Sequence, residues 1–281
     1  MAVPVGAVVL AGGRSSRMGT AKAALPWHGS TLLRRTVGVL ARVAHGPVVV
    51  VRAAGQQLPS LPAAVEVVDD DEQARGPLHG MAVGLGALAT RTDLALVCST
   101  DLPFLHPAFL RRLVALRGDA DVVLPVVRGH RQPLVAGYRT ELAGAARGLL
   151  AQDRARPAFL LEAATVRAVE EAELLADARL RAVDPELDSV HGVDDPAAYE
   201  LACARPQPEV VVHRTGVLAS PGGASTSTVR AATLGAAATA VGLLLDRHLL
   251  AAVDGDQVVR DVETPLVQGD AVTFLSADAG G

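Results

Sequence analysis

The sequence predicts an α/β protein with a mostly parallel sheet, followed by a smaller α+β domain. Over the first part of the chain, apolar runs suited to buried strands alternate with segments of helical periodicity. After a proline-rich stretch at residues 205–208, short strand patterns with turn signals prevail. Strands that alternate with helices pair in parallel and are covered on both faces, so ligands are expected at their carboxyl ends.

The expected elements follow in order along the chain. Buried strands are predicted at Val5–Leu10, Pro47–Val51, Val65–Val68, Leu94–Cys98, Val122–Pro125 and Leu134–Tyr138. Helices are predicted at Thr31–Ala44, Leu78–Thr90, Pro107–Leu116, Glu141–Gln152 and near Pro196–Cys203. The C-terminal strands are predicted at Val210–His213, Leu249–Val253, Val258–Val262 and Ala271–Leu275, around one helix at Ala231–Leu245. Turn signals occur at Asp254-Gly255-Asp256 and Gln268-Gly269-Asp270.

Composition and charge exclude several classes of function. Aromatic residues make up 2% of the 281 residues and the net charge is −4, so neither stacking platforms nor a basic face for nucleic acid is evident. The two cysteines, Cys98 and Cys203, have no metal-binding spacing and fit a reduced cytoplasm. Because no apolar run approaches the roughly 20 residues that span a bilayer, we expect a soluble cytoplasmic protein without a membrane partner.

The first predicted strand runs directly into a glycine-rich loop with basic residues, LAGGRSSRMGTAK at residues 10–22. Glycines let backbone N–H groups turn toward an anion, and Arg14, Arg17 and Lys22 supply positive charge. The spacing is neither that of a P-loop nor that of a Rossmann dinucleotide site. Lys22 is the single lysine of the chain, and a compact ammonium in place of a guanidinium suggests a specific contact. This loop is predicted to cradle a polyphosphate, the alternative being a solvated turn.

Acidic residues follow two later strands. Asp101 comes directly after the predicted strand Leu94–Cys98, where one carboxylate can hold Mg²⁺ against a triphosphate. The alternative for Asp101 is a helix cap or an Asx turn before Pro103. Asp69 could accept hydrogen bonds from a base or ribose, whereas residues 70–72 are expected in a solvated loop. His79 is not expected to be catalytic, and no hydrolase or zinc-protease motif occurs.

Five segments follow one another along the chain: LAGGRSSRMGTAK, RGPLHGM, CSTDLPF, RQPLVAGY and GVDDPAAYELA. Together they resemble the nucleotidyltransferase family of the molybdenum cofactor guanylyltransferase, MobA, over roughly Val5 to Ala204. The resemblance implies a three-layer, Rossmann-like α/β fold of the glycosyltransferase-A type at residues 1–204, with a linker at residues 205–208. It also implies transfer of GMP from GTP to molybdopterin, with Mg²⁺ as cofactor and pyrophosphate as the second product.

The same resemblance implies a role for individual residues. The nucleotide-binding residues would be Leu10, Ala11, Gly12, Gly13, Lys22, Asp69 and Asp101. The catalytic residues would be Lys22, Asp101 and Arg17, and the metal ligands Asp101 and Asp194. This chain departs from the family at Asp194, where Asn is usual, at Ala21, where Asp is usual, and at Arg52, where a neutral polar residue is common.

Residues 209–281 resemble a second family. The segments LLAAVDG, TPL and GDAVTF and the terminal Gly280-Gly281 are similar to MoaD, the small subunit of molybdopterin synthase. The related sulfur carrier ThiS also ends in Gly-Gly, but these segments favour the MoaD branch. The resemblance implies a ubiquitin-like β-grasp fold whose Gly281 carboxylate an E1-like adenylating enzyme activates for thiocarboxylation. The partners implied are that enzyme and the large subunit of molybdopterin synthase. Residues 276–279 depart from the family's usual Pro-Pro-Val-x before the glycines.

Three functions stay open from the sequence. The favoured hypothesis is a guanylyltransferase that also carries a sulfur-carrier domain. A cytidylyltransferase that uses CTP is the second, although Leu10-Ala11-Gly12-Gly13 favours guanine because the cytidylyl relatives usually have Ala-Ala-Gly there. The third is a scaffold and carrier protein without transferase activity, which the departure at Ala21 keeps open.

Overall fold

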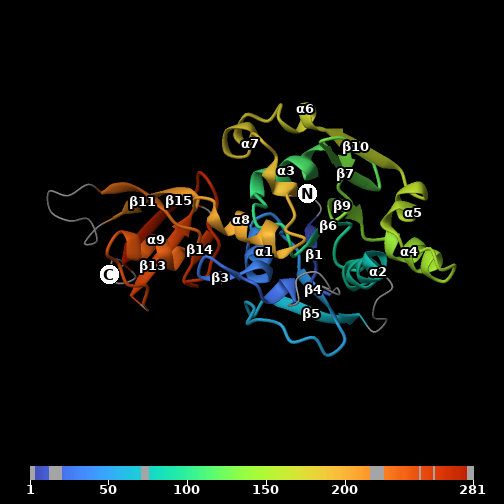
Figure 1. Ribbon diagram of the computed structural model, residues 1–281, viewed down its shortest axis with the longest axis horizontal. Coiled ribbons are helices and arrows are strands. Elements are labelled where there is room, and N and C mark those ends of the chain that lie inside the picture. Colours follow the sequence, from blue (N-terminus) through green and yellow to red (C-terminus); the bar gives the residue numbers. More distant parts are fainter. Residues whose placement is uncertain are drawn as a thin grey trace. The chain divides into compact units, whose positions relative to one another are not determined.

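The computed structural model describes residues 4–12, 21–70, 76–215, 225–246, 248–255 and 257–276. The chain divides into two compact units (Figure 1), one of Met1–Leu25 with Leu32–Tyr199 and one of Pro26–Thr31 with Glu200–Gly281. Each unit has its own sheet and its own apolar core. The division falls inside helix α8 (Pro196–Ala204), a few residues before the proline-rich stretch.

The first unit alternates strands and helices along the chain. Its strands are β1 (Val5–Leu10), β4 (Val48–Ala53), β5 (Val65–Asp70), β6 (Leu94–Ser99), β7 (Val122–Val127), β8 (His130–Arg131), β9 (Val135–Arg139) and β10 (Val166–Glu170). Its helices are η1 (Lys22–Ala24), α1 (Leu32–Ala41), α2 (Pro77–Leu88), α3 (Pro107–Leu116), α4 (Leu142–Leu150), α5 (Pro157–Glu162), α6 (Glu171–Leu174), α7 (Ala178–Val183) and η2 (Asp188–Val190).

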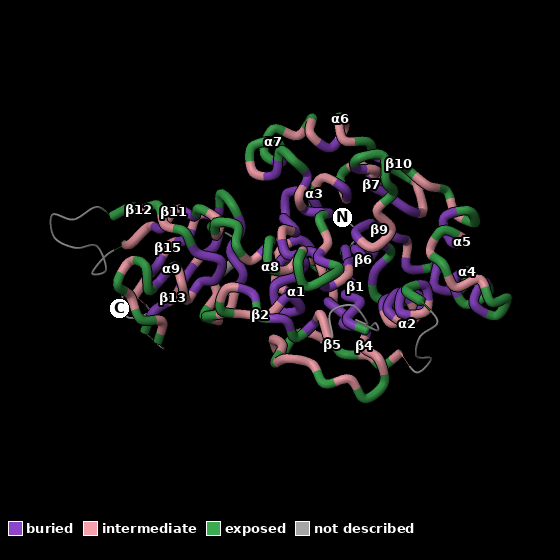
Figure 2. Tube along the Cα trace, in the orientation of Figure 1, coloured by how far each residue is buried: buried purple, intermediate pink, exposed green. Residues whose placement is uncertain are grey.

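The large sheet has the strand order β10-β7-β9-β6-β1-β4-β5, with β8 paired to β7. Neighbours β6, β1, β4 and β5 are all parallel, as are β10 and β7, whereas β9 runs antiparallel to both of its neighbours. The mostly parallel sheet predicted from the sequence is thereby confirmed. Helices α2 and α4 pack with one face of the strands in a single core, while α1 and α3 contact the sheet separately from them. Figure 2 shows the central strands as the buried part of this unit.

Helix α2 lies unusually close to the sheet because two glycines face the strands. A Cβ atom at Gly84 would lie 2.3 Å from Cγ1 of Val8 and 3.0 Å from Cγ2 of Val51. At Gly80, one turn earlier, it would lie 3.1 Å from Cδ2 of Leu10. The helix begins after Gly76, whose φ of 90° suits glycine, and Pro77 occupies its first turn, where no backbone donor is needed. These residues fix α2 against the carboxyl half of β1.

Two five-residue strands of the described chain were not among the sequence predictions. In β10 the burial pattern shows one buried residue, Val169, and β12 (Thr226–Arg230) alternates exposed and half-buried residues. Both strands lie at the edge of a sheet, where solvent replaces one neighbour and polar side chains suffice. The apolar runs on which the predictions relied are a property of central strands.

The second unit contains a sheet of strand order β12-β11-β15-β13-β14 and the small hairpin of β2 (Pro26–Trp27) and β3 (Ser30–Thr31). Strand β11 (Glu209–Arg214) is parallel to β15 (Ala271–Ser276) and antiparallel to β12. Strand β13 (Leu249–Val253) is antiparallel to β15 and to β14 (Gln257–Val259). Helix α9 (Leu234–Ala240) shares one apolar core with the alternate residues of β11, β13 and β15.

Helix α9 is shorter than the helix predicted at Ala231–Leu245. The side chain of Thr233 accepts a hydrogen bond from the backbone N–H of Ala236 and so caps the first turn. Gly242, with a φ of 73°, follows the last turn and supports a left-handed C-terminus. Periodicity extended the prediction at both ends because apolar residues continue beyond the two caps. Of the predicted turn Asp254-Gly255-Asp256, the first two residues both have positive φ and lie between the paired strands β13 and β14, whereas Asp256 lies outside the described residues.

Cys98 is buried and Cys203 is half-buried, and both are free thiols. Burial raises the pKa of the Cys98 thiol well above its ordinary range, so this side chain is an inert part of the core. Across the described residues, none of the helices has the length and apolar character needed to cross a membrane.

We predict that Gly84→Ala lowers the free energy of unfolding by about 1–3 kcal/mol, because the new methyl group overlaps the Val8 side chain. Gly144→Ala is the matched control, since Gly144 lies in α4 and a methyl group added there would meet no neighbouring atom within 4 Å. The control is expected to raise stability by about 0.5–1 kcal/mol through helix propensity. Urea titrations followed by circular dichroism measure both, and equal effects of the two substitutions would contradict the close packing of α2.

Candidate active site

Three charged side chains from distant parts of the chain meet at one point. The Nζ atom of Lys22 lies 2.8 Å from Oδ2 of Asp101 and 2.8 Å from Oδ1 of Asp194. Lys22 and Asp101 are 18% and 19% exposed, whereas Asp194 is 71% exposed. Burial lowers the pKa of Lys22, but its hydrogen bonds to Asp101 and Asp194 and their charges more than offset this, so its pKa is raised overall. The ammonium is therefore charged at neutral pH.

Asp101 is held in place by the end of strand β6. The hydroxyl of Ser99, the last residue of the strand, donates to Oδ1 of Asp101, which leaves Oδ2 for Lys22. The backbone carbonyl of Asp101 accepts a hydrogen bond of 2.9 Å from the N–H of Val193. That bond ties the loop before α8 to the carboxyl end of β6 and brings Asp194 to the site.

The two consecutive aspartates of that loop have different tasks. Oδ1 of Asp195 accepts a hydrogen bond of 2.8 Å from the N–H of Ala198, in the first turn of α8. This is the capping arrangement expected of an aspartate before a helix. With Asp195 engaged at the helix, Asp194 extends its carboxylate to Lys22.

A second charged pair lies at the ends of β4 and β5. Nε of Arg52 is 2.6 Å from Oδ1 of Asp69, and Nη1 of Arg52 donates to the carbonyl of Gln56. The side chain of Gln56 in turn donates to the carbonyl of Ala11 and accepts from the N–H of Ala53. Arg52, which departs from the family pattern, is thus in direct contact with the predicted nucleotide-binding residue Asp69.

The residues after β1 lie between these two groups. The N–H groups of Ala11 and Gly12 both donate to the carbonyl of Val51, at 2.8 and 3.1 Å. Leu10 and Ala11 are buried and Gly12 is exposed. A Cβ atom on Gly12 would lie 3.0 Å from the backbone nitrogen of Ala53, so a side chain at this position would press on β4. A glycine avoids this contact.

Strand register aligns the ends of β6, β1, β4 and β5 at one edge of the sheet. Leu10 of β1 is in register with Ser99 of β6 and with Val51 of β4. Arg52 of β4 is in register with Asp69 of β5. Because these four neighbouring strands are parallel, their carboxyl ends share one edge, which is where ligands bind in such sheets.

Residues 70–72 were predicted to lie in a solvated loop, and the structure differs from this at Asp70. Asp70 is the last residue of the strand, its carboxylate contacts Nδ1 of His79 on α2, and the two side chains are 18% and 14% exposed. Asp70 is therefore not a solvated loop residue, and the sequence prediction was wrong for it, because the strand continues two residues further than its apolar run.

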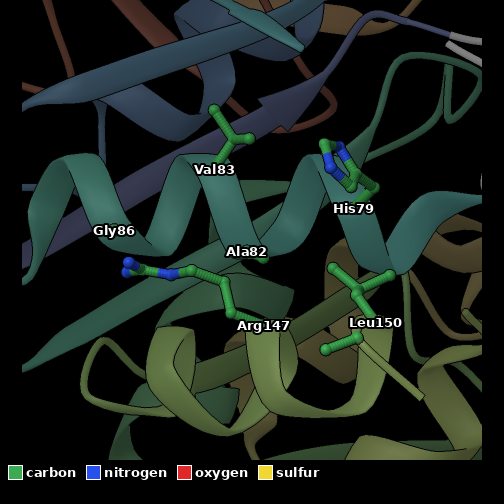
Figure 3. A pocket seen from close by; sticks show the side chains of 7 residues that line it. His79, Ala82, Val83, Gly86, Arg147 and Leu150 are labelled. Carbon is green, nitrogen blue, oxygen red and sulfur yellow. The ribbon is translucent and has the colours of Figure 1, made fainter. Parts of the chain in front are cut away.

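A cavity of about 560 Å³ lies between α2 and α4. Figure 3 shows Arg147 of α4 extending along α2 to Gly86, with Leu150 pointing toward α2. The cavity is lined by His79, Ala82, Val83, Gly86, Arg147, Leu150 and Ala151. None of the predicted site residues that the structure describes lines it, so it is separate from the three charged side chains described above.

Several predicted site residues lie outside the described part of the chain. These are Gly13 and Arg17 in the first loop and Gly280 and Gly281 at the C-terminus. Two residues that the sequence analysis gave no role, Ser99 and Gln56, orient predicted ones. Ser99 could have been found from its spacing, because a hydroxyl two residues before an aspartate can reach its carboxylate. Gln56 carried no signal, since it reaches a carbonyl 45 positions earlier in the chain.

Comparisons with known proteins place this site in context. The MobA-like NTP transferase domain matches residues 7–170. A probable molybdenum cofactor guanylyltransferase of Mycobacterium tuberculosis is 39% identical over 182 residues, which are 63% of this chain and 87% of that protein. A second relative with the same description, from Mycobacterium avium, is 41% identical over 141 residues, covering 48% of this chain and 70% of that one.

Solved structures show the same fold at lower sequence identity. Molybdopterin-guanine dinucleotide biosynthesis protein A of Archaeoglobus fulgidus aligns with a TM-score of 0.55 at 23% identity, covering 70% of this chain and 96% of that one. A 2-C-methyl-D-erythritol 4-phosphate cytidylyltransferase of Thermus thermophilus aligns with a TM-score of 0.51 at 21% identity, covering 73% of this chain and 98% of that one.

The mostly parallel sheet and these structural likenesses give the first unit a Rossmann-like α/β fold. The match to the NTP transferase model and the similarity to the mycobacterial relatives make it a nucleotidyltransferase. The matched residues include Lys22, Asp69 and Asp101. The chain belongs to the MobA-like NTP transferase family.

We predict that Asp195→Ala lowers the free energy of unfolding more than Asp194→Ala does, because only Asp195 caps a helix. Loss of the cap on α8 is expected to lower the free energy of unfolding by about 1 kcal/mol in Asp195→Ala. Asp194 is mostly exposed, and Lys22 keeps Asp101 as its partner when Asp194 is removed. The free energy of unfolding of Asp194→Ala is therefore expected to lie within about 0.5 kcal/mol of that of the unsubstituted protein. Chemical denaturation of both variants is the measurement, and a larger loss for Asp194→Ala would contradict this division of tasks.

Proposed function

We propose that the first unit transfers GMP from GTP to molybdopterin, giving the guanine dinucleotide cofactor and pyrophosphate. The observation that carries the proposal is the meeting of Lys22, Asp101 and Asp194 at the carboxyl edge of the sheet. A cation and two carboxylates are the groups that bind a metal-complexed triphosphate. The 39% identity to a probable molybdenum cofactor guanylyltransferase supports the choice of GTP and molybdopterin.

The carboxylates fit a divalent cation. Asp101 and Asp194 approach one point closely enough to share a single ammonium group, and oxygen ligands are those that Mg²⁺ prefers. Within the described residues, no group of three or more His, Cys, Asp or Glu side chains could hold a metal ion. Mg²⁺ is commonly held by one or two carboxylates together with substrate phosphates, so Asp101 and Asp194 would be its protein ligands. When bound, the ion would neutralise charge on the phosphates.

The reaction needs positioning more than proton transfer. A phosphate oxygen of molybdopterin would form a bond to the α-phosphorus of GTP as the bond from that phosphorus to the leaving pyrophosphate breaks. The nucleophile is already an anion, so no general base is required. Lys22 and Arg17 would hold the triphosphate in line for this attack. The composition of the charged group, one lysine and two aspartates, agrees with such a mechanism.

The nucleotide would lie along the neighbouring strand ends. Leu10, Ala11, Gly12 and Gly13 would contact the base and ribose, and Asp69 would accept hydrogen bonds from the nucleotide. The contact between Arg52 and Asp69 means that a guanidinium accompanies this carboxylate in the base region. A donor next to an acceptor can pair with the O6 and N1–H groups of guanine.

We predict that Asp101→Ala lowers the rate of pyrophosphate release by about 10³-fold or more, because it removes a ligand of the metal that neutralises the phosphates. The assay uses molybdopterin and Mg²⁺ with GTP, CTP, ATP and UTP in parallel. Release with GTP alone, lost in the variant, is the expected result. A preference for CTP would replace the proposal by a cytidylyltransferase, and no release with any nucleotide would leave the scaffold and carrier hypothesis.

We also propose that the second unit is a sulfur carrier of the MoaD and ThiS type, with a β-grasp fold. Its support is a five-stranded sheet in which the first and last strands, β11 and β15, are parallel central neighbours, with α9 covering one face. The terminal Gly280-Gly281 gives a tail without side chains that can enter an adenylating enzyme. Its partners would be an E1-like adenylating enzyme and the large subunit of molybdopterin synthase.

We predict that co-expression with an adenylating partner adds the mass difference of sulfur for oxygen to the intact protein, because the Gly281 carboxylate becomes a thiocarboxylate. Intact-protein mass spectrometry is the measurement, and deletion of Gly281 is the control that should abolish the gain. The same mass in both samples, once the deleted glycine is accounted for, would contradict the sulfur-carrier function while leaving the transferase proposal untouched.

A further inference from the structure

The roles proposed for Lys22, Asp101 and Asp194 conflict with the geometry in which they are found. Lys22 is proposed to bind the triphosphate, and the two aspartates are proposed to bind the metal. In the structure the ammonium of Lys22 instead lies between the two carboxylates, 2.8 Å from an oxygen of each. A metal ion that used both carboxylates would need the place that Lys22 holds.

Asp101 is fixed by its surroundings more firmly than the side chain of Lys22. Asp101 is held by Ser99 and by the N–H of Val193, and Asp194 follows that same tied backbone and precedes the helix cap Asp195. Lys22 is fixed through its backbone, whose carbonyl accepts from the N–H of Leu25 at the end of η1. Its four-carbon side chain carries a point charge and can turn to a new partner. Lys22 can therefore turn from Asp101 to a new partner while Asp101 stays in place.

Charge explains why the lysine has to leave before a metal ion can bind well. With Lys22 in place, the three side chains sum to one negative charge, and without it to two. A divalent cation brought to the carboxylates would also be repelled by the ammonium at close range, where the site is only partly exposed to solvent. A triphosphate supplies several negative charges that can draw the ammonium away.

We propose that Lys22 is an internal counter-ion that blocks the carboxylates of Asp101 and Asp194 against free metal ions, so that the metal enters together with the triphosphate. The proposal rests on the proposed function in taking a nucleoside triphosphate as the substrate. Lys22 leaves the carboxylates for the phosphates, and the freed carboxylates are then available as metal ligands. The metal ion and the nucleotide thus bind as one complex.

The test measures Mn²⁺ binding without any nucleotide. Electron paramagnetic resonance of free Mn²⁺ gives the dissociation constant for the unsubstituted protein, for Lys22→Met and for Lys22→Gln. Removal of the positive charge is expected to tighten Mn²⁺ binding by at least about tenfold. Lys22→Arg is the matched control, because a guanidinium keeps the charge and can bridge two carboxylates, and it should bind Mn²⁺ as weakly as the unsubstituted protein.

A fourth variant locates the ion. In Lys22→Met combined with Asp101→Asn the gain in Mn²⁺ affinity should disappear, and circular dichroism of each variant establishes that it is folded. Mn²⁺ should also raise the melting temperature of Lys22→Met but not that of the unsubstituted protein, since a ligand stabilises the state that binds it. Equal Mn²⁺ affinity in the unsubstituted protein, Lys22→Met and Lys22→Gln would overturn the proposal. Because no nucleotide is present, this outcome is independent of whether GTP is the substrate.

Discussion

The backbone hydrogen bonds that align β6, β1, β4 and β5 in parallel are the constraint on which the candidate site depends. They place the ends of four strands along one edge, so that Asp101, Gly12, Arg52 and Asp69 follow one another across the sheet. Parallel neighbours need a long crossover connection, commonly a helix, and the glycines of α2 allow that helix to pack closely on β1 and β4. The positions of the site residues at the carboxyl edge of the sheet therefore depend on the close packing of α2 against β1 and β4.

Local pattern was enough to predict the central strands, because a strand buried on both faces must be apolar throughout. Local pattern also identified Lys22 and Asp101 as candidate site residues, since each lies in a motif that follows such a strand. Local pattern could not predict that Asp194 meets Lys22, because these residues are 172 positions apart in the chain. Their contact depends on the backbone hydrogen bond from Val193 to Asp101. Edge strands β10 and β12 were missed for a different reason, as their polar faces resemble loops.

The two kinds of basic residue in this chain have different tasks. Several arginines donate to backbone carbonyl groups, as Arg35 does to Pro103 and Arg112 to Glu173, and Arg52 pairs with the carboxylate of Asp69. The planar guanidinium is suited to those fixed geometries. The one lysine bridges two carboxylates instead and has to exchange partners if substrate binds as proposed. In this interpretation, arginine serves the lasting contacts and lysine serves the contact that changes when substrate binds.

Possession of a single lysine also makes this protein unusually easy to observe by spectroscopy. A sample grown with isotopically labelled lysine would contain one labelled side chain, and that side chain lies between Asp101 and Asp194. Its resonance would have no neighbours of the same type to overlap with. Titration of any candidate substrate could thus be followed at one atom, without substituting a residue of the site.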